Sequence, residues 1–161
     1  ISLPKGPLRY GTVFEMFPFD NAFATLKLTA AELSAILAQN LRADNGMLAL
    51  SGMTAAAHCE GRRLTVQLFD RAGQLVAPEQ PLTVVTSDFL AASGDGVLTG
   101  LGLAPSAIKV ERDRVIRDAL LEGLIAYPGG KLDGADKRLF DPELPRIRYV
   151  GARPVRCEGE H

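Results

Sequence analysis

The sequence predicts a single α+β domain covering residues 1–161. The chain has 161 residues, of which 47% are hydrophobic and 23% charged, as in a folded domain with one core. Segments with strand alternation and segments with helical periodicity are mixed without strict alternation, and at least one hairpin is expected. We therefore expect a mixed or antiparallel sheet packed by two main helices and a short N-terminal helical turn.

The proline residues Pro4 and Pro7 predict an extended segment before the first helix or strand. Thr12 and Glu15 then have the spacing of a capping box, which predicts a short helical turn that Pro18 must end. Residues 22–28 alternate and predict a strand. One face of this strand holds Ala22, Ala24, Leu26 and Leu28.

The clearest helix signal begins at Thr29. Thr29 and Glu32 form a second capping box, and apolar residues then recur at helical spacing. These residues are Leu33, Ile36, Leu37 and Leu41. Asn45-Gly46 predicts a turn, and the segment from Met47 to Ala57 predicts a strand interrupted at Gly52.

The middle of the chain predicts two further strands. Residues 63–69 alternate with Leu64, Val66 and Leu68 facing inward, and the turn at 70–73 leads back toward Leu75 and Val76, which indicates a hairpin. Residues 82–86 predict a short strand that ends in a loop over 87–96.

A second amphipathic helix is predicted near residue 120. Its apolar residues are Val115, Ile116, Ala119, Leu120 and Leu124. Pro128-Gly129-Gly130 should stop this helix. We expect the domain core to cover about residues 8–126, with a tail rich in proline and charge over 128–161.

The charge balance and the apolar runs limit the possible partners. Eighteen Lys plus Arg against 19 Asp plus Glu give a net charge of −1, which predicts no nucleic acid polymer and no anionic membrane as a partner. No apolar run approaches the roughly 20 residues that span a bilayer. The chain starts at Ile1 without a signal-peptide pattern, so we expect any signal peptide to have been removed or to lie outside this sequence.

Two cysteines, Cys59 and Cys157, leave two interpretations open. They can be two buried thiols, or one long-range disulfide in an oxidising compartment. Sequence alone does not supply their distance, so the two interpretations carry equal weight.

The common catalytic motifs are absent from the sequence. There is no Gly-x-Ser-x-Gly, no His-Glu-x-x-His and no phosphate-binding loop of the Gly-x-x-x-x-Gly-Lys type. The only histidines are His58 and the terminal His161, and no carboxylate pair stands out. A catalytic or metal-binding cluster built on histidine is therefore not expected.

Two aromatic loops remain as candidates for ligand binding. The first is Phe17-Pro18-Phe19-Asp20-Asn21, and the second runs from Phe89 to Gly96. A planar base held between two aromatic faces gains about 1–3 kcal/mol from stacking, while a carboxylate can accept ribose hydroxyls and an amide can pair with a base edge. A single Phe is more often part of a core. Together, the two loops have the components of a nucleoside clamp.

Five ordered segments carry a resemblance to a known family. They are Tyr10 to Glu15, Phe17 to Asn21, Leu28 to Leu33, Gly46 to Gly52 and Thr86 to Gly96. In this order they resemble the C-terminal domain of 5'-nucleotidases and UDP-sugar hydrolases, over about the first 125 residues.

The resemblance implies a division of labour between two domains. An N-terminal metallophosphoesterase domain, outside this chain, would carry two divalent metal ions and the catalytic groups, and this domain would bind the nucleoside part of the nucleotide. Carried over residue by residue, Phe19 and Phe89 would sandwich the base, Asn21 would contact its edge, Asp95 would accept ribose hydroxyls and Gly46 would let the backbone approach. The resemblance further implies a periplasmic or secreted hydrolase, and inactivity of this chain alone.

The sequence also departs from the family pattern. The family usually has Gly where this chain has Asp20, which adds a negative charge near a phosphorylated ligand and leaves the substrate preference open. The Gly-Gly-x-Arg segment that holds the phosphate in the family is not in this sequence, and Arg9 is not assigned its role.

Three alternatives remain beside the clamp in a phosphohydrolase. The first is a nucleoside-binding module without a catalytic partner. The second is a thiosulfohydrolase-like relative, against which the retained Phe pair argues. The third is an interaction domain with both Phe rings in the core.

Overall fold

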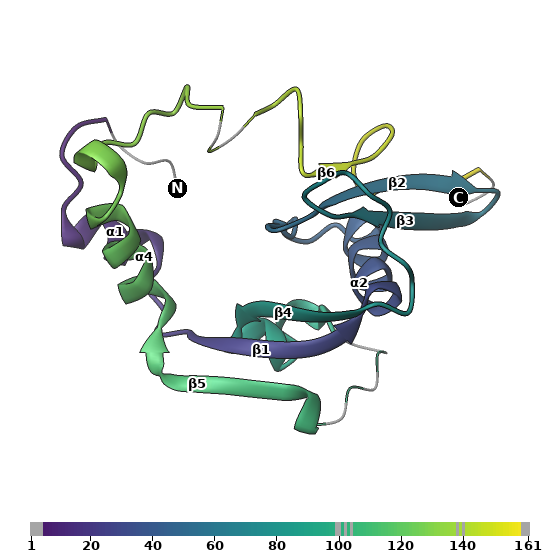
Figure 1. Cartoon of the computed structure of the whole chain (residues 1–161), viewed down its shortest axis with the longest axis horizontal. Coiled ribbons are helices and arrows are strands. Elements are labelled where there is room, and N and C mark those ends of the chain that lie inside the picture. Colours follow the sequence, from purple (N-terminus) through teal and green to yellow (C-terminus); the bar gives the residue numbers. More distant parts are fainter. Residues whose placement is uncertain are drawn as a thin grey trace.

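Two three-stranded sheets and a helix between them form the body of the protein. The computed structural model describes residues 5–98, 101, 103, 105–137, 139 and 141–158. The strand orders are β4-β1-β5 in the first sheet and β3-β2-β6 in the second (Figure 1). The α+β prediction is confirmed, with two small sheets where one sheet was expected.

The first sheet is built around β1 (Ala22–Thr29), which pairs antiparallel with β4 (Pro81–Ser87) and β5 (Ile108–Val115). Side chains in β1 alternate between buried and more exposed positions, as the sequence predicts. The register runs from Phe23 opposite Ser87 to Thr29 opposite Pro81. The beginning of β1 therefore lies beside the end of β4.

Helix α2 (Ala30–Arg42) begins at the predicted capping box. The Thr29 hydroxyl accepts the Glu32 N–H at 3.2 Å, and the Glu32 carboxylate accepts the Thr29 N–H at 2.6 Å. Both donors lack partners within the helix, so the two side chains satisfy them reciprocally.

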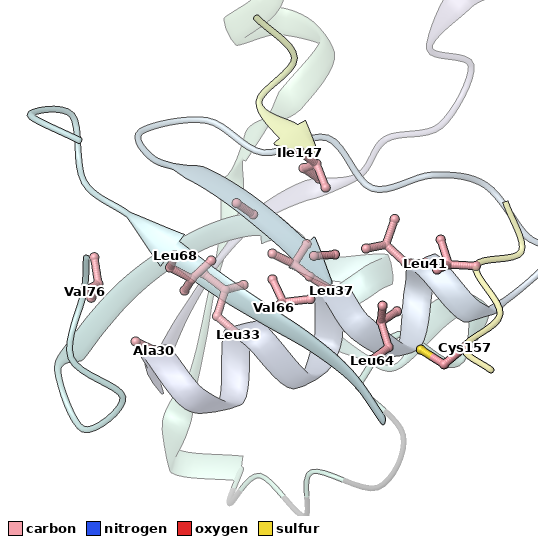
Figure 2. Packing of buried hydrophobic residues seen from close by; sticks show 13 residues of the cluster. Ala30, Leu33, Leu37, Leu41, Leu64, Val66, Leu68, Val76, Ile147 and Cys157 are labelled. Carbon is pink, nitrogen blue, oxygen red and sulfur yellow. The ribbon is translucent and has the colours of Figure 1, made fainter. Parts of the chain in front are cut away.

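The second sheet is a hairpin with a short third strand. Strand β2 (Thr54–Glu60) pairs antiparallel with β3 (Arg63–Phe69), and β6 (Ile147–Arg148) adds to β2 in parallel. The predicted inward residues of β3 are buried together with α2 in one cluster (Figure 2). The hairpin predicted between β3 and residues 75–76 is present only as a single β-bridge between Phe69 and Leu75.

Helix α2 is buried on two sides and so joins the two sheets. Leu33 and Leu37 pack in the cluster of the second sheet (Figure 2), whereas Ile36 packs with Leu26 of the first sheet. The apolar stripe of α2 is wide enough for contacts with both sheets, because each sheet covers a different part of the stripe.

Two further helices lie at one end of the molecule. Helix α1 (Tyr10–Met16) packs on α4 (Ile116–Ile125), and both stand beside the beginning of β1 (Figure 1). The short α3 (Asp88–Ala91) follows β4 directly. Short 3-10 turns cover Gly94–Gly96, Pro105–Ala107 and Pro128–Gly130.

The predicted capping box at Thr12 is wrong. Helix α1 has Arg9 as its N-cap, three residues before Thr12, and Arg9 makes no side-chain capping bond. Its buried residue is Val13, and the helix packs on α4. Tertiary packing thus outweighs a local signal worth about 1 kcal/mol.

The predicted strand from Met47 to Ala57 exists only from Thr54 onward. Before Thr54, the backbone of this segment forms hydrogen bonds with a side chain and not with a neighbouring strand. The buried Asn40 side chain donates to the Gly46 carbonyl at 2.9 Å and accepts the Leu48 N–H at 3.0 Å. Gly52, with φ of +90°, then turns the chain into β2.

Strands β5 and β6 were not predicted from the sequence. The charged run at 111–114 hides the alternation of β5, which is an edge strand and needs only one bonded neighbour. Beyond residue 128, Ile147, Val155 and Cys157 are buried in the cluster of the second sheet. The charged C-terminal segment therefore supplies part of the core.

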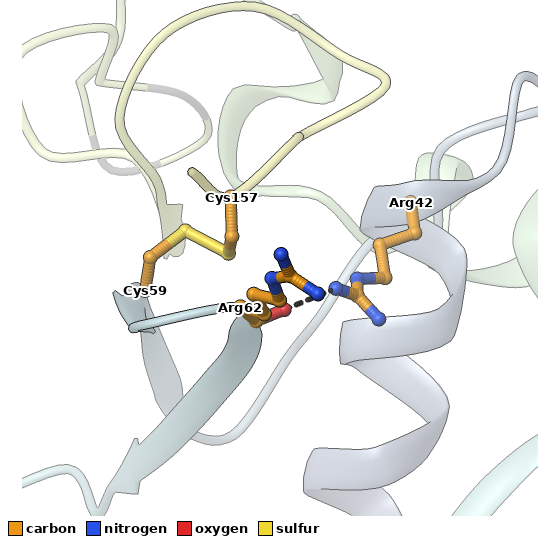
Figure 3. The surroundings of a disulfide bond; sticks show 4 residues. All are labelled: Arg42, Cys59, Arg62 and Cys157. Carbon is orange, nitrogen blue, oxygen red and sulfur yellow. Dashed lines mark hydrogen bonds between the residues drawn. A yellow bond between two sulfur atoms is a disulfide. The ribbon is translucent and has the colours of Figure 1, made fainter. Parts of the chain in front are cut away.

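A disulfide joins Cys59, at the end of β2, to Cys157 near the C-terminus (Figure 3). Of the two interpretations that the sequence left open, the structure has the disulfide. Nearby, Arg42 at the end of α2 donates to the Arg62 carbonyl at 3.0 Å, which fastens the β2–β3 turn to the helix (Figure 3).

Candidate functional site

The first aromatic loop joins α1 to β1 and presents Phe19 to solvent, where it is 71% exposed. Helix α1 ends before Pro18, because proline cannot continue a helix there. At the other end of the loop, the half-buried Asn21 accepts the Ile116 N–H through its backbone carbonyl at 2.9 Å. The start of α4 thus fixes the point where the loop enters β1.

Arg117, in the first turn of α4, is a buried charged residue beside this loop. Its Nη2 donates to Asp20 Oδ1 at 2.7 Å, and its Nη1 donates to the Phe17 carbonyl at 3.3 Å. The guanidinium carbon lies 4.7 Å from the centre of the Phe14 ring. The hydrogen bond to Asp20 is the main cause that raises the pKa of Arg117, so the guanidinium stays charged.

The second aromatic loop begins with Asp88. The Ser87 hydroxyl caps α3 by accepting the Leu90 N–H at 3.2 Å. Asp88 Oδ1 accepts the N–H of Phe89 at 2.9 Å and the N–H of Ala22 at 3.1 Å. One carboxylate oxygen therefore connects the end of the first loop to the start of the second.

Phe89 is 50% exposed and lies against the backbone at Gly94. A Cβ at position 94 would stand 2.5 Å from the Phe89 ring and 2.5 Å from its carbonyl oxygen. Real Cβ atoms do not approach other atoms so closely, so this position requires glycine. Gly94 therefore determines where the Phe89 ring can lie.

Asp95 is exposed and has a left-handed backbone, with φ of 55°, as does Ser93, with φ of 64°. This conformation is uncommon for residues other than glycine and costs on the order of 1–3 kcal/mol. The Asp95 carbonyl accepts the Asn45 side-chain amide at 3.5 Å, a long contact that brings Asp95 beside Gly46.

Gly46 is exposed, and the fold does not require a glycine there. No atom lies within 4 Å of a Cβ built at this position, and its φ is not positive. Its carbonyl is held by the buried Asn40 at 2.9 Å. The open space beside Gly46 is the feature expected where backbone approaches a ligand.

A chain of contacts thus connects all five predicted site residues. Asp88 joins the loop of Phe19 and Asn21 to Phe89, Gly94 joins Phe89 to the Asp95 turn, and Asn45 joins that turn to Gly46. Neither Phe19 nor Phe89 belongs to the ring pair recorded among the described residues, Tyr10 with Phe14 at 6.3 Å. Their exposure contradicts the alternative with both Phe rings in the core.

A hollow of about 730 Å³ is lined by residues of β1, β4, α2 and the segment 47–53, and by Leu90 and Val97 near the second aromatic loop. Its walls are mostly aliphatic and include Leu48, Leu50, Leu82, Val84, Leu90 and Val97. Ribose hydroxyls and a phosphate would find few partners there. The exposed side of the loops, with two Phe rings and a carboxylate, suits a nucleoside better.

The described part of the chain holds neither a group of metal ligands nor a helix that could span a membrane. It contains no group of three or more His, Cys, Asp or Glu placed to hold a metal ion. Over those same residues, no helix combines the length and the apolar character needed to cross a bilayer.

Comparison with known proteins places this fold and these loops in a family. The model of the family described as "5'-nucleotidase, C-terminal domain" matches residues 1–101. The chain therefore belongs to this family of C-terminal domains. No curated protein matches the chain.

Solved structures agree at the level of the fold. NAD nucleotidase from Haemophilus influenzae is similar with a TM-score of 0.63 and 14% identity, covering 88% of this chain and 26% of that chain. A 5'-nucleotidase precursor from Thermus thermophilus is similar with a TM-score of 0.64 and 24% identity, covering 92% and 29%. This chain therefore spans less than a third of the length of either structure.

Two residues of the site were not anticipated from the sequence. Arg117 has no local motif, since its partners lie about a hundred residues earlier. Asp88 stands beside Phe89 in the sequence, but its bond to Ala22 depends on the pairing of β1 with β4. A buried arginine or a bridging carboxylate becomes visible only once the strands are placed.

Proposed function

We propose that this chain binds the nucleoside part of a nucleotide, with the base between the rings of Phe19 and Phe89. In this proposal Asn21 contacts the base edge, Asp95 accepts ribose hydroxyls, and the backbone at Gly46 approaches the ligand. The binding orients the phosphate ester for cleavage by a second domain. The supporting observation is that Asp88 joins the loops of two exposed Phe rings at one end of the β1–β4 pair.

The reaction itself belongs to an N-terminal metallophosphoesterase domain of the same polypeptide. Two divalent metal ions held there would polarise the phosphate and activate a water. The residues of this chain contribute binding and orientation, which lower the barrier by holding the ester near the attacking group. Alone, this chain binds nucleosides and does not turn over nucleotides.

We place the protein in the periplasm or outside the cell. A disulfide between Cys59 and Cys157 supports this location, because disulfides form and persist in oxidising compartments. Extracellular nucleotides would then be its substrates, as in nucleotide catabolism.

Calorimetry with adenosine on the native chain tests the binding proposal. Removing one ring, in Phe19→Ala or in Phe89→Ala, should weaken adenosine binding by about tenfold or more, since stacking contributes about 1–3 kcal/mol per base. Leu75→Ala is the matched control, because Leu75 is 61% exposed but lies beyond β3 in the second sheet. No heat from the native chain at millimolar adenosine contradicts the clamp, as do equal affinities in all variants.

Hydrolysis is tested on the protein that contains both domains. Assays with a nucleoside monophosphate, a UDP-sugar and a cyclic nucleotide separate the substrate classes, all of which present a base and a ribose. Loss of each ring should lower kcat/KM for the preferred class and leave hydrolysis of a base-free phosphate ester unchanged. A full-length protein that binds adenosine but hydrolyses none of them would be a binding module.

A further inference from the structure

We propose that Arg117 is a positioning residue for the Phe19 ring, an inference that rests on the proposed function. Arg117 contacts the first aromatic loop on both sides of Phe19, through the Phe17 carbonyl and the Asp20 carboxylate. These contacts are with the neighbours of Phe19 and not with its ring, so Arg117 acts through the loop.

The burial of Arg117 shows that its contacts are specific. Its side chain is 8% exposed, while that of Asp20 is 76% exposed. A guanidinium is removed from water only where partners replace its hydration. Here the Phe17 carbonyl and Asp20 replace it at Nη1 and Nη2, whereas the buried Nε has no hydrogen-bond partner among the described residues and only a charge contact with Asp118 at 3.8 Å.

Contacts from α4 hold the neighbours of Phe19 in the loop, whereas the exposed Phe19 side chain itself is not held. Phe17 and Asp20 are held by Arg117, and Asn21 is held by the backbone of Ile116, the preceding residue of α4. A loop held two residues before Phe19 and one residue after it, with the rigid Pro18 in between, leaves Phe19 little backbone freedom. Its exposed ring is thereby pre-organised, and less conformational entropy is lost when a base stacks on it.

Phe14 makes the arrangement specific for arginine. The flat guanidinium lies 4.7 Å from the Phe14 ring centre while donating in two directions. A lysine ammonium can pair with Asp20, but it cannot lie flat on a ring and reach both oxygens in the same way. Arg117→Lys should therefore restore only part of the function.

The same pairing neutralises Asp20. An unpaired carboxylate next to Phe19 would repel a phosphorylated ligand. Because Arg117 pairs with Asp20, the loop presents its aromatic ring without a net charge. This makes Arg117 relevant to nucleotides as well as to nucleosides.

The test uses two readouts on the 161-residue chain labelled with 4-fluorophenylalanine. The Phe19 fluorine signal is assigned with Phe19→Leu. In Arg117→Ala this signal should narrow and move toward its random-coil position, because the exposed Phe19 ring then lies on a loop that is no longer held in one conformation, while the Phe89 signal stays in place. Adenosine affinity should fall by about three- to tenfold, a part of one ring's stacking contribution, with Arg117→Lys in between.

Arg114→Ala is the matched control, because Arg114 also lies over a ring, 5.6 Å from the centre of Phe23, a residue of β1 outside both aromatic loops. It should change neither readout. Asp20→Asn provides a second test should Arg117→Ala unfold, since the amide oxygen still accepts from the buried guanidinium but without the charge that strengthens the contact. An unchanged Phe19 signal in the folded variants overturns the inference. A moved signal in a protein that never binds adenosine supports the positioning role and overturns only the proposed function.

Discussion

Asp88 accepts a hydrogen bond from the backbone N–H of Ala22 at 3.1 Å, across 66 residues of sequence. The same oxygen accepts the N–H of Phe89. Because Ala22 directly follows the first aromatic loop, this contact sets the distance between the two loops. The candidate site therefore depends on a residue that need not touch the ligand.

Asp88→Ala should weaken both stability and binding. It leaves two backbone donors without their acceptor, at about 1 kcal/mol each, so urea unfolding should show a loss of roughly 1–2 kcal/mol. Adenosine affinity should fall by about tenfold as the loops separate. Asp88→Asn keeps an oxygen acceptor and should therefore lose less stability and less adenosine affinity than Asp88→Ala.

Asp70→Ala is the control for Asp88. Asp70 Oδ1 likewise accepts two backbone N–H groups, from Ala72 and Gln74, in a turn of the second sheet. It should lower stability without changing adenosine affinity. Equal affinities in the Asp88 and Asp70 variants would show that the bridge has no part in binding.

Gly94→Ala should displace the Phe89 ring. The added Cβ would overlap both the ring and its carbonyl, so the turn must shift, at a cost of about 1–3 kcal/mol. Calorimetry should then show weaker adenosine binding. Gly123→Ala in α4, where nothing lies within 4 Å, should instead stabilise the chain by about 1 kcal/mol and leave binding intact.

Gly46→Ala separates a ligand contact from a structural one. Its Cβ meets no atom within 4 Å, so the free energy of unfolding should change by less than about 0.5 kcal/mol. If the backbone there approaches the ligand, adenosine affinity falls all the same. A variant with native stability and native affinity would remove Gly46 from the site.

The parts of the fold predicted well have strong local signals. Strand β1 alternates through its whole length, and Thr29 with Glu32 forms the capping box of α2 as expected. Strand β5 was missed because four consecutive charged residues interrupt its alternation. The Met47 segment was misassigned because its bonds go to Asn40, a partner that no periodicity reveals.

The candidate site divides in the same way. Phe19 and Phe89 could be selected from the sequence because their loops follow a proline and a strand end. The contacts that hold them come from Asp88 and Arg117 and depend on strand pairing and on the packing of α4. Local sequence thus selects candidate ligand-binding residues, and tertiary structure determines how they are held.

The capping box of α2 makes stability depend on pH. Hydrogen bonds from the Thr29 backbone and then from its side chain lower the pKa of Glu32 below its ordinary value of 4.5. A carboxylate with a lowered pKa stabilises the fold above its unfolded-state pKa, and this contribution is lost as the pH falls through its folded-state pKa.

Glu32→Gln should therefore be less stable than the native chain at pH 7. Urea unfolding across pH should show this difference shrinking below about pH 4.5, once the carboxylate becomes neutral. In a Thr29→Ala background, which itself costs about 1 kcal/mol, the pH-dependent part should shrink but persist, because the backbone N–H at position 29, the larger cause of the lowered pKa, still donates to Glu32. A difference that stays constant through the acid range contradicts this role of the carboxylate.

The last prediction concerns the disulfide and the C-terminal segment. The bond spans 98 residues, and a cross-link over so long a loop strongly restricts the unfolded chain. The segment is also held by Arg153, which donates to the Asn40 carbonyl at 2.7 Å, and by Val155, whose N–H donates to Leu41 at 2.9 Å. Cys59→Ala with Cys157→Ala should thus cost about 2–4 kcal/mol without detaching the segment completely.

Urea unfolding with and without a reductant tests this. The reductant should lower the stability of the native chain toward that of the double variant and leave the variant unchanged. Adenosine affinity should stay the same in both, because the disulfide fixes the second sheet, whereas the aromatic loops belong to the first sheet and α4. A loss of affinity on reduction would instead mean that the two sheets are coupled through α2, the helix buried against both.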